Sequence, residues 1–176
     1  MSKIQHVAVI GAGRMGKAIA IAFAYAGLQV KLIDAKVRPE QEFIQYRQQV
    51  QQDLTQELTL LRTIQFVQAE QIAVIQANIQ ILAKLESTKF LTQCDLIMEG
   101  VPEQTQAKQE IFSWLDQYIS PQCIVASTTS TFLVTDIAQM LSHPERVVNA
   151  HWLNPAYLIP LVELSCSEQT SDAVVE

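Results

Sequence analysis

Residues 7–16 are Val-Ala-Val-Ile-Gly-Ala-Gly-Arg-Met-Gly, an apolar run followed by glycines at positions 11, 13 and 16. Four successive apolar residues are typical of a strand that is buried on both faces of a parallel sheet. The alanine-rich residues 14–26 favour a helix, and Gly27 is placed to end it. A strand, a Gly-x-Gly-x-x-Gly turn and a helix in this order predict a unit that binds a dinucleotide.

Each of the three glycines has a separate task in this interpretation. Gly11 allows a sharp turn, Gly13 lets backbone N–H groups approach a pyrophosphate, and Gly16 lets the helix pack closely against the strand. The N-terminus of the helix then presents free N–H groups and the positive end of its dipole to the phosphates. A structural βαβ unit without a ligand is the alternative that the motif leaves open.

The second apolar run, residues 30–33, ends at Asp34. An acidic residue about 20 positions after the glycines is where the adenine ribose hydroxyls are bound. A carboxylate at this place favours NAD and repels the extra phosphate of NADP. Asp34 could otherwise be a cap on the end of a strand.

The composition indicates one globular domain with a sizeable core. The chain has 176 residues, of which 49% are hydrophobic and 17% charged, and its net charge is −6. It shows no basic stripe, so we expect no nucleic acid partner. It also shows no apolar stretch of membrane-spanning length and no signal peptide, so we expect no membrane association and a cytoplasmic location.

The cysteines and histidines outside the main motifs do not indicate a metal site. Cys94, Cys123 and Cys166 are widely spaced and odd in number, which predicts reduced, packed thiols instead of disulfides or a zinc framework. We expect His6 to lie on the surface before the first strand. His143 precedes a proline in a predicted turn, and neither histidine has a carboxylate at metal-ligand spacing.

A long helix follows Asp34, and a second helix begins near Ala69. Apolar residues recur at helical spacing in the first of these helices, at Phe43, Tyr46, Val50, Leu54, Leu58 and Leu61. Its other face is rich in glutamine, which we interpret as a solvated face. The two helices predict a helical hairpin inserted after the second strand.

Strands and helices alternate through the rest of the chain. We expect strands at residues 79–82, 95–99, 123–126, 147–150 and 161–164, and helices at 86–92, 106–118 and 133–141, the last capped by Thr131 or Thr135. This order predicts an α/β fold with a doubly wound, mostly parallel sheet of the Rossmann type. Ligands of such sheets bind beyond the carboxyl ends of the strands, where Asp34, Glu103, residues 127–130 and residues 151–154 should converge.

His151 ends one predicted strand and Glu163 lies on the next. The residues between them include Asn154, Pro155 and Pro160, which turn a chain, so the returning strand should bring Glu163 beside His151. A carboxylate bonded to an imidazole fixes its tautomer and raises its basicity, as a general base requires to take a proton from an alcohol. A histidine that is only hydrogen-bonded at a strand end is the alternative.

Several stretches together resemble the NAD-binding domain of the 3-hydroxyacyl-CoA dehydrogenases over nearly the whole chain. They are Val-Ile-Gly-Ala-Gly-Arg-Met-Gly at 9–16, Val-Pro-Glu at 101–103 with Lys108, Ala-Ser-Thr-Thr-Ser at 126–130, Pro-Glu-Arg at 144–146, His-Trp-Leu-Asn-Pro at 151–155 and Pro-Leu-Val-Glu at 160–163. The resemblance implies that His151 is the catalytic base, Glu163 its partner, and Ser130 a contact of substrate and nicotinamide. It implies a cofactor site at Gly11, Gly13, Met15, Gly16, Asp34, Glu103, Lys108 and Asn154.

The resemblance implies NAD-dependent oxidation of a (3S)-3-hydroxyacyl-CoA to the 3-ketoacyl-CoA and the reverse reaction. The family usually has asparagine at the place of Thr128, where its relatives that act on free hydroxy acids such as carnitine and gulonate also vary. A dehydrogenase of a free 3-hydroxy acid is therefore an alternative substrate class. The residues that contact CoA in the family have no counterpart that we can place in the glutamine-rich hairpin.

The end of the chain bears on the expected domain organisation. We expect a cofactor-binding domain at residues 1–166, and in residues 167–176 the start of a linker or helix to an all-α domain that closes the substrate cleft in the family. In the family that helical domain makes most of the dimer interface, so a homodimer is one of two alternatives for this chain, the other being a monomer. An NAD-binding module with little or no catalysis is the third interpretation.

Overall fold

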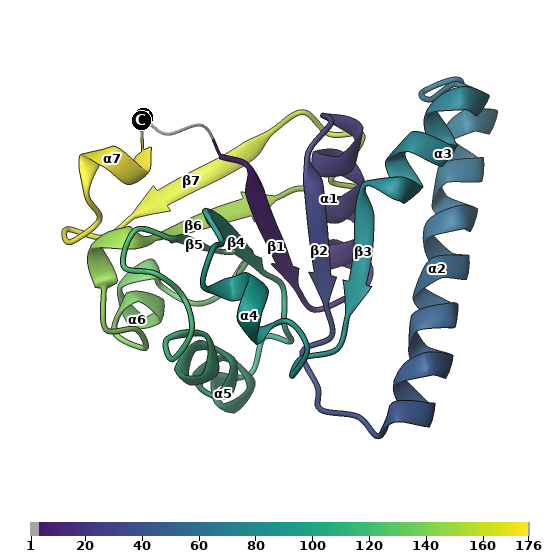
Figure 1. Cartoon of the computed structure of the whole chain (residues 1–176). Helices are drawn as coiled ribbons and strands as arrows, with labels where there is room; N and C mark the ends of the chain where they lie inside the picture. The colour runs from purple at the N-terminus through teal and green to yellow at the C-terminus, as the bar shows by residue number, and fades with distance from the viewer. Residues whose placement is uncertain (1–3, 176) are drawn as a thin grey trace.

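A computed structural model describes residues 4–175 and contains one seven-stranded sheet. The strands lie in the order β3-β2-β1-β4-β5-β6-β7 (Figure 1). Their bounds are β1 His6–Ile10, β2 Gln29–Ile33, β3 Ile79–Leu82, β4 Leu96–Glu99, β5 Ile124–Ser127, β6 Val147–Trp152 and β7 Val162–Cys166. Neighbouring strands from β3 to β6 are parallel, and β7 pairs with β6 in the antiparallel direction. The predicted doubly wound, mostly parallel sheet is confirmed.

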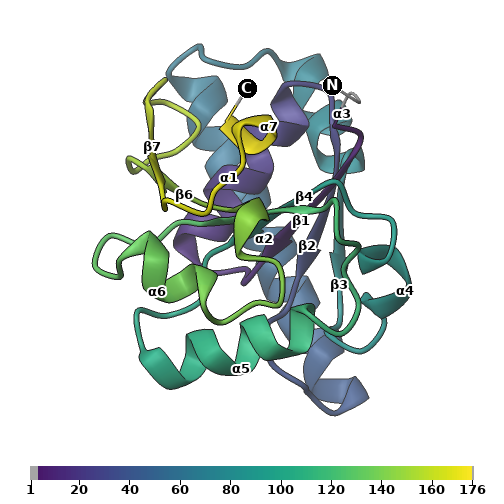
Figure 2. The same ribbon diagram turned by 90° about the vertical axis from the view of Figure 1, so that its left-hand side faces the viewer.

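Helices cover both faces of this sheet (Figures 1 and 2). Their bounds are α1 Arg14–Tyr25, α2 Glu40–Thr63, α3 Ala69–Ala77, α4 Thr88–Leu91, α5 Thr105–Leu115, α6 Val134–Ala138 and α7 Asp172–Val175, with a short 3₁₀ helix at Pro144–Arg146. The side chains of one strand alternate between two cores. Val9 of β1 packs with residues of α1, α2 and α3, whereas Ala8 and Ile10 pack with residues of α5 and α6. Alternation is the geometric property of a strand that allows one sheet to carry two cores.

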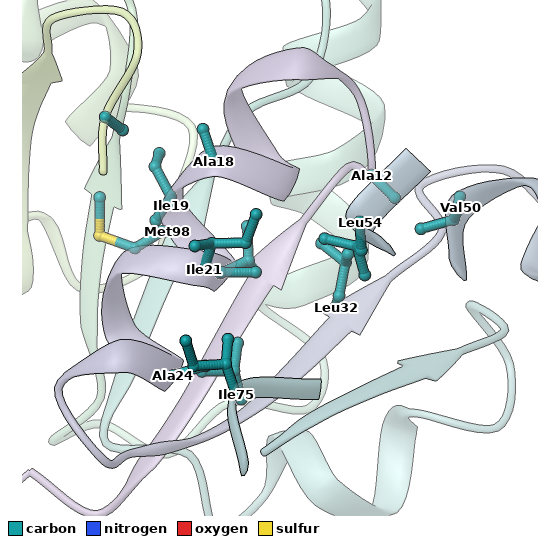
Figure 3. Close-up of a cluster of buried hydrophobic side chains, with 14 of the residues drawn as sticks. Ala12, Ala18, Ile19, Ile21, Ala24, Leu32, Val50, Leu54, Ile75 and Met98 are labelled. Atoms are coloured by element: carbon teal, nitrogen blue, oxygen red, sulfur yellow. The ribbon is translucent and has the colours of Figure 1, made fainter. Parts of the chain in front are cut away.

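The predicted helical hairpin is formed by α2 and α3. The expected apolar positions of α2 are buried except Tyr46, which is partly buried. Leu54 lies beside Leu32 of β2 in the core shared with α1 (Figure 3). An ion pair also joins α2 to α1: Lys17 Nζ of α1 lies 2.5 Å from Asp53 Oδ2 of α2. The hairpin therefore packs on α1 instead of standing apart as an independent unit.

Three details differ from the sequence-based expectations. Helix α6 has five residues and begins after Leu133, with no capping bond from a side chain, so the predicted threonine cap is wrong. Thr131 instead donates its hydroxyl to Glu103, as described below. Cys94 and Cys123 are buried as predicted, but Cys166 is exposed because it lies on the edge strand β7.

The turn between β1 and α1 brings two backbone segments into close contact. Gly11 has a φ of +96°, a conformation that a residue with a Cβ atom rarely adopts. A Cβ atom added at Gly16 would lie 1.8 Å from the carbonyl oxygen of Gly11. The first turn of α1 can therefore rest on the end of β1 only if residue 16 has no side chain.

We expect Gly16→Ala to destabilise the fold strongly, because the obstructing atom is backbone and cannot move aside as a flexible side chain could. Overpacking of this kind costs about 1–3 kcal/mol or more, which denaturant unfolding without cofactor would measure. Gly13→Ala is the matched control, since an added Cβ at residue 13 meets nothing within 4 Å. Equal stability of the Gly16 variant and the wild type would contradict the packing argument.

Candidate cofactor cleft and catalytic pair

A cleft of about 460 Å³ lies at the carboxyl edge of the sheet. Its walls come from the ends of β1, β2, β4 and β5 and from the start of α2. The lining residues are Gly11 to Met15, Asp34 to Lys36, Arg38, Tyr46, Gly100 to Glu103, Thr128 and Ser130. The convergence of strand ends that the sequence predicts is therefore present for Asp34, Glu103, Thr128 and Ser130.

The start of α1 has the properties of a site for the phosphates of a dinucleotide. Gly13 is its N-cap residue, no side chain caps the helix, and its first turn contains no acidic residue. The space where a Cβ of Gly13 would stand is open. Free N–H groups at an accessible helix N-terminus bind phosphate well. Gly11, Gly13 and Met15 line the cleft, whereas Gly16 lies outside the lining and contributes by packing.

Asp34 lies at the end of β2, in the position that a ribose-binding carboxylate requires. Only 2% of its surface is exposed. Its Oδ1 accepts a hydrogen bond from the backbone N–H of Lys36 at 3.1 Å, and its Oδ2 accepts one from Arg38 Nε at 2.6 Å. The sequence does not predict Arg38 for the site, because residues 34–39 lie between β2 and α2, where no helical or strand periodicity relates Arg38 to Asp34.

Lys108 does not line the cleft, although the resemblance places it in the cofactor site. It is 1% exposed, and its Nζ donates to Glu99 Oε1 at 3.2 Å and to Glu99 Oε2 at 3.0 Å. Glu99 is fully buried and accepts further hydrogen bonds from the Val101 N–H at 2.7 Å and the Ser127 hydroxyl at 2.6 Å. This buried ion pair ties α5 to the loop that forms one wall of the cleft. Glu99 is not predicted as a site residue, because in the sequence it is only the last residue of a strand.

Glu103 is held over the same wall by two threonines. Its Oε2 accepts hydrogen bonds from the Thr129 hydroxyl at 2.6 Å and the Thr131 hydroxyl at 2.8 Å, and Lys108 Nζ lies 4.0 Å from its Oε1. Burial acts to raise the pKa of Glu103, but these hydrogen bonds and the charge of Lys108 together hold the pKa below its usual value. Glu103 is therefore an ionised acceptor that fixes the loop after β5.

His151 stands between Ser130 and Glu163. Strand β7 returns beside β6 with His151 opposite Glu163, and His151 Nδ1 lies 2.9 Å from Glu163 Oε2. On the other side of the ring, Nε2 lies 3.1 Å from Ser130 Oγ. Because Ser130 lines the cofactor cleft, the imidazole is connected to that cleft through one hydroxyl.

Asn154 lies outside the lining of the cleft, although the resemblance places it in the cofactor site. It is exposed and precedes Pro155 in the loop between β6 and β7.

Within residues 4–175, no three His, Cys, Asp or Glu side chains are grouped so that they could hold a metal ion. No helix in this described part is both long and apolar enough to span a membrane.

We expect Lys108→Met to lower the free energy of unfolding by about 3–5 kcal/mol, because it leaves the buried Glu99 charge without its partner. The double variant Glu99→Gln with Lys108→Met should recover part of this loss, since no buried charge then remains. Glu110→Gln on the exposed face of the same helix is the control and should change stability little. Unchanged stability with weaker NADH binding would instead place Lys108 against the cofactor.

The Thr131 hydroxyl stabilises the ionised form of Glu103, so Thr131→Val should raise the pKa of Glu103 toward its usual value. Because the native pKa is lowered, the stability from this contact is present above the usual pKa of glutamate and is lost as the pH falls through the lowered value. An NMR titration of the side-chain carboxyl carbon would measure the shift. Thr135→Val, an exposed site in α6, should leave the titration unchanged.

Comparison with known proteins assigns this chain to a family. The family model described as the 3-hydroxyacyl-CoA dehydrogenase NAD-binding domain matches residues 6–176. The 3-hydroxybutyryl-CoA dehydrogenase of Bradyrhizobium diazoefficiens is 32% identical over 176 residues, which cover 98% of this chain and 56% of the relative. The L-carnitine dehydrogenase/betainyl-CoA thioesterase of a Rhizobium species is 31% identical over 180 residues, covering 100% of this chain and 33% of the relative.

A solved structure shows the same fold. The 3-hydroxybutyryl-CoA dehydrogenase from Escherichia coli superposes with a TM-score of 0.85 at 29% sequence identity, covering 98% of this chain and 34% of that one. The chain thus spans about half or less of the length of these relatives. The family description names NAD, which confirms the cofactor predicted from the glycine turn and Asp34. The chain belongs to the 3-hydroxyacyl-CoA dehydrogenase family, in which it corresponds to the NAD-binding domain.

Proposed function

We propose that this chain supplies the cofactor site and the general base for NAD-dependent oxidation of a (3S)-3-hydroxyacyl-CoA to the 3-ketoacyl-CoA, and for the reverse reaction. The observation that carries the proposal is the position of His151, which contacts Glu163 through one ring nitrogen and Ser130 through the other. A histidine oriented by a carboxylate and facing a hydroxyl at the cofactor cleft is suited to alcohol oxidation.

The Glu163 carboxylate determines which nitrogen of His151 can act as the base. An ionised carboxylate only accepts hydrogen bonds, so Nδ1 carries the proton and the neutral ring keeps a lone pair on Nε2. Nε2 then accepts a hydrogen bond from the Ser130 hydroxyl in this structure. A substrate hydroxyl bound at the same place can lose its proton to Nε2, and Glu163 stabilises the resulting imidazolium.

The remaining groups of the cleft hold the cofactor and direct it toward His151. When bound, NAD supplies the acceptor for the hydride that leaves the alcohol carbon. The first turn of α1 is suited to the pyrophosphate and Asp34 to the adenine ribose. Ser130 belongs both to the lining of the cleft and to the contact with His151, so it marks the end where the nicotinamide would meet the substrate.

A free 3-hydroxy acid is the second candidate substrate. The chain is 31% identical to an L-carnitine dehydrogenase/betainyl-CoA thioesterase and 32% identical to a 3-hydroxybutyryl-CoA dehydrogenase. Because the two identities are nearly equal, they do not favour one substrate class over the other. The structure also places Thr128 in the lining of the cofactor cleft beside Gly100. A residue in that position is suited to contact the cofactor, so its departure from the family pattern does not by itself indicate a different substrate.

We expect His151→Ala to lower turnover of acetoacetyl-CoA with NADH by about 10²–10⁴-fold, the usual contribution of a general acid–base group, while NADH binding is kept. His143→Ala is the matched control, because His143 also pairs with a carboxylate, Glu145, at 2.9 Å but lies in another turn. Glu163→Gln should lower turnover less than His151→Ala does. Normal turnover in the His151 variant would overturn the assignment of the base.

The same assay separates the three interpretations of the chain. Reduction of acetoacetyl-CoA with NADH supports the proposed substrate class. Oxidation of carnitine or gulonate with NAD, without turnover of acetoacetyl-CoA, would support a free hydroxy acid as the substrate. NADH binding without turnover of any of these compounds would identify a binding module. Each measurement uses the 176-residue chain, with NADH binding followed separately by fluorescence.

A further inference from the structure

The end of the cleft beside Asp34, where the adenosine of a dinucleotide would bind, also contains positively charged side chains. Asp34, Lys36, Arg38 and Tyr46 all line it. The carboxylate of Asp34 already has a partner on each oxygen, the backbone N–H of Lys36 and the guanidinium of Arg38. The charge of Asp34 is therefore paired with that of Arg38, and the exposed Lys36 adds a second positive side chain to the lining. The formal charges of these three side chains sum to a positive value.

Arg38 is held in place from two sides. Its Nε donates to Asp34 at 2.6 Å, and its guanidinium carbon lies 4.2 Å from the centre of the Tyr46 ring. This stacking on an aromatic face is favourable for a guanidinium. Within residues 4–175, only Nε of this guanidinium has a hydrogen-bond partner, and 26% of the side chain is exposed. The two terminal nitrogens remain available for a ligand in the cleft.

A guanidinium in this position is suited to an anion at the adenine ribose. The planar fork of arginine matches the oxygens of a phosphate. Dinucleotide-binding folds use an acid for the ribose 2′-hydroxyl of NAD or an arginine for the 2′-phosphate of NADP, and this cleft has both residue types. The expectation that Asp34 repels such a phosphate assumes a free carboxylate. In this structure Arg38 neutralises the carboxylate, so the main source of repulsion is removed.

We propose that the cleft binds NADP(H) as well as NAD(H), with Arg38 and Lys36 receiving the 2′-phosphate. The inference concerns binding at the adenosine end and does not depend on His151 or on the substrate of the reaction. It makes Arg38 the residue that determines discrimination between the two cofactors.

Binding of NADH, NADPH, 5′-ADP and 2′,5′-ADP to the wild type and to Arg38→Gln tests the proposal by calorimetry. The wild type should bind NADPH within about tenfold of NADH. Arg38→Gln should weaken NADPH and 2′,5′-ADP by about tenfold or more, the size of a lost charge-assisted hydrogen bond, and change NADH and 5′-ADP by less than about threefold. The two ADP compounds lack nicotinamide, so their result is independent of catalysis.

Arg47→Gln is the control for loss of one positive charge, since Arg47 lies on α2 outside the lining of the cleft. A wild type that binds NADPH more than about 100-fold more weakly than NADH, with the ratio unchanged in Arg38→Gln, would overturn the proposal. Equal weakening of all four ligands would do so too, because Arg38 would then only orient Asp34. Should Arg38→Gln fail to fold, Lys36→Gln and Arg38→Lys test the same ratio.

Discussion

The contact between Gly16 and the carbonyl of Gly11 is the constraint on which the rest of the structure depends. It brings the first turn of α1 onto the end of β1, so that the uncapped helix N-terminus opens into the cleft. Gly11 also donates its backbone N–H to Ile33 at the end of β2. The turn therefore sets both the direction of the helix and the distance between the phosphate site and Asp34.

Two carboxylates organise the opposite side of the cleft. Glu99 is buried behind the wall, and the partly exposed Glu103 belongs to the lining. Glu99 joins α5 and β5 to the end of β4, and Glu103 joins the following loop to Thr129 and Thr131. The oxygens of Glu99 are satisfied by several donors, as a charged group removed from water requires, whereas Glu103 keeps part of its carboxylate exposed. Because Thr129 and Ser130 are neighbours in the chain, the hydrogen bond that fixes Thr129 also limits where Ser130 can stand against His151.

His151 and Glu163 illustrate how much of the site a local pattern can predict. A strand, a turn with prolines and a returning strand place the two residues opposite each other, and the structure has this register. Lys108 shows the limit, because a family motif gives a residue type and a position but not the direction of a side chain. Once α5 packs on the sheet, the ammonium of Lys108 is directed to Glu99, which the sequence does not distinguish from any strand-end acid.

The amino-acid sequence by itself determined the alternation of strands and helices in a dinucleotide-binding fold, the helical hairpin after β2 and the polar residues at strand ends. These follow from local periodicity and from glycines whose conformational demands are local. Only the tertiary structure decided which charges meet, namely Glu99 with Lys108 and Asp34 with Arg38. The physical reason is that an ion pair depends on distance and burial, and both are known only after the elements have packed.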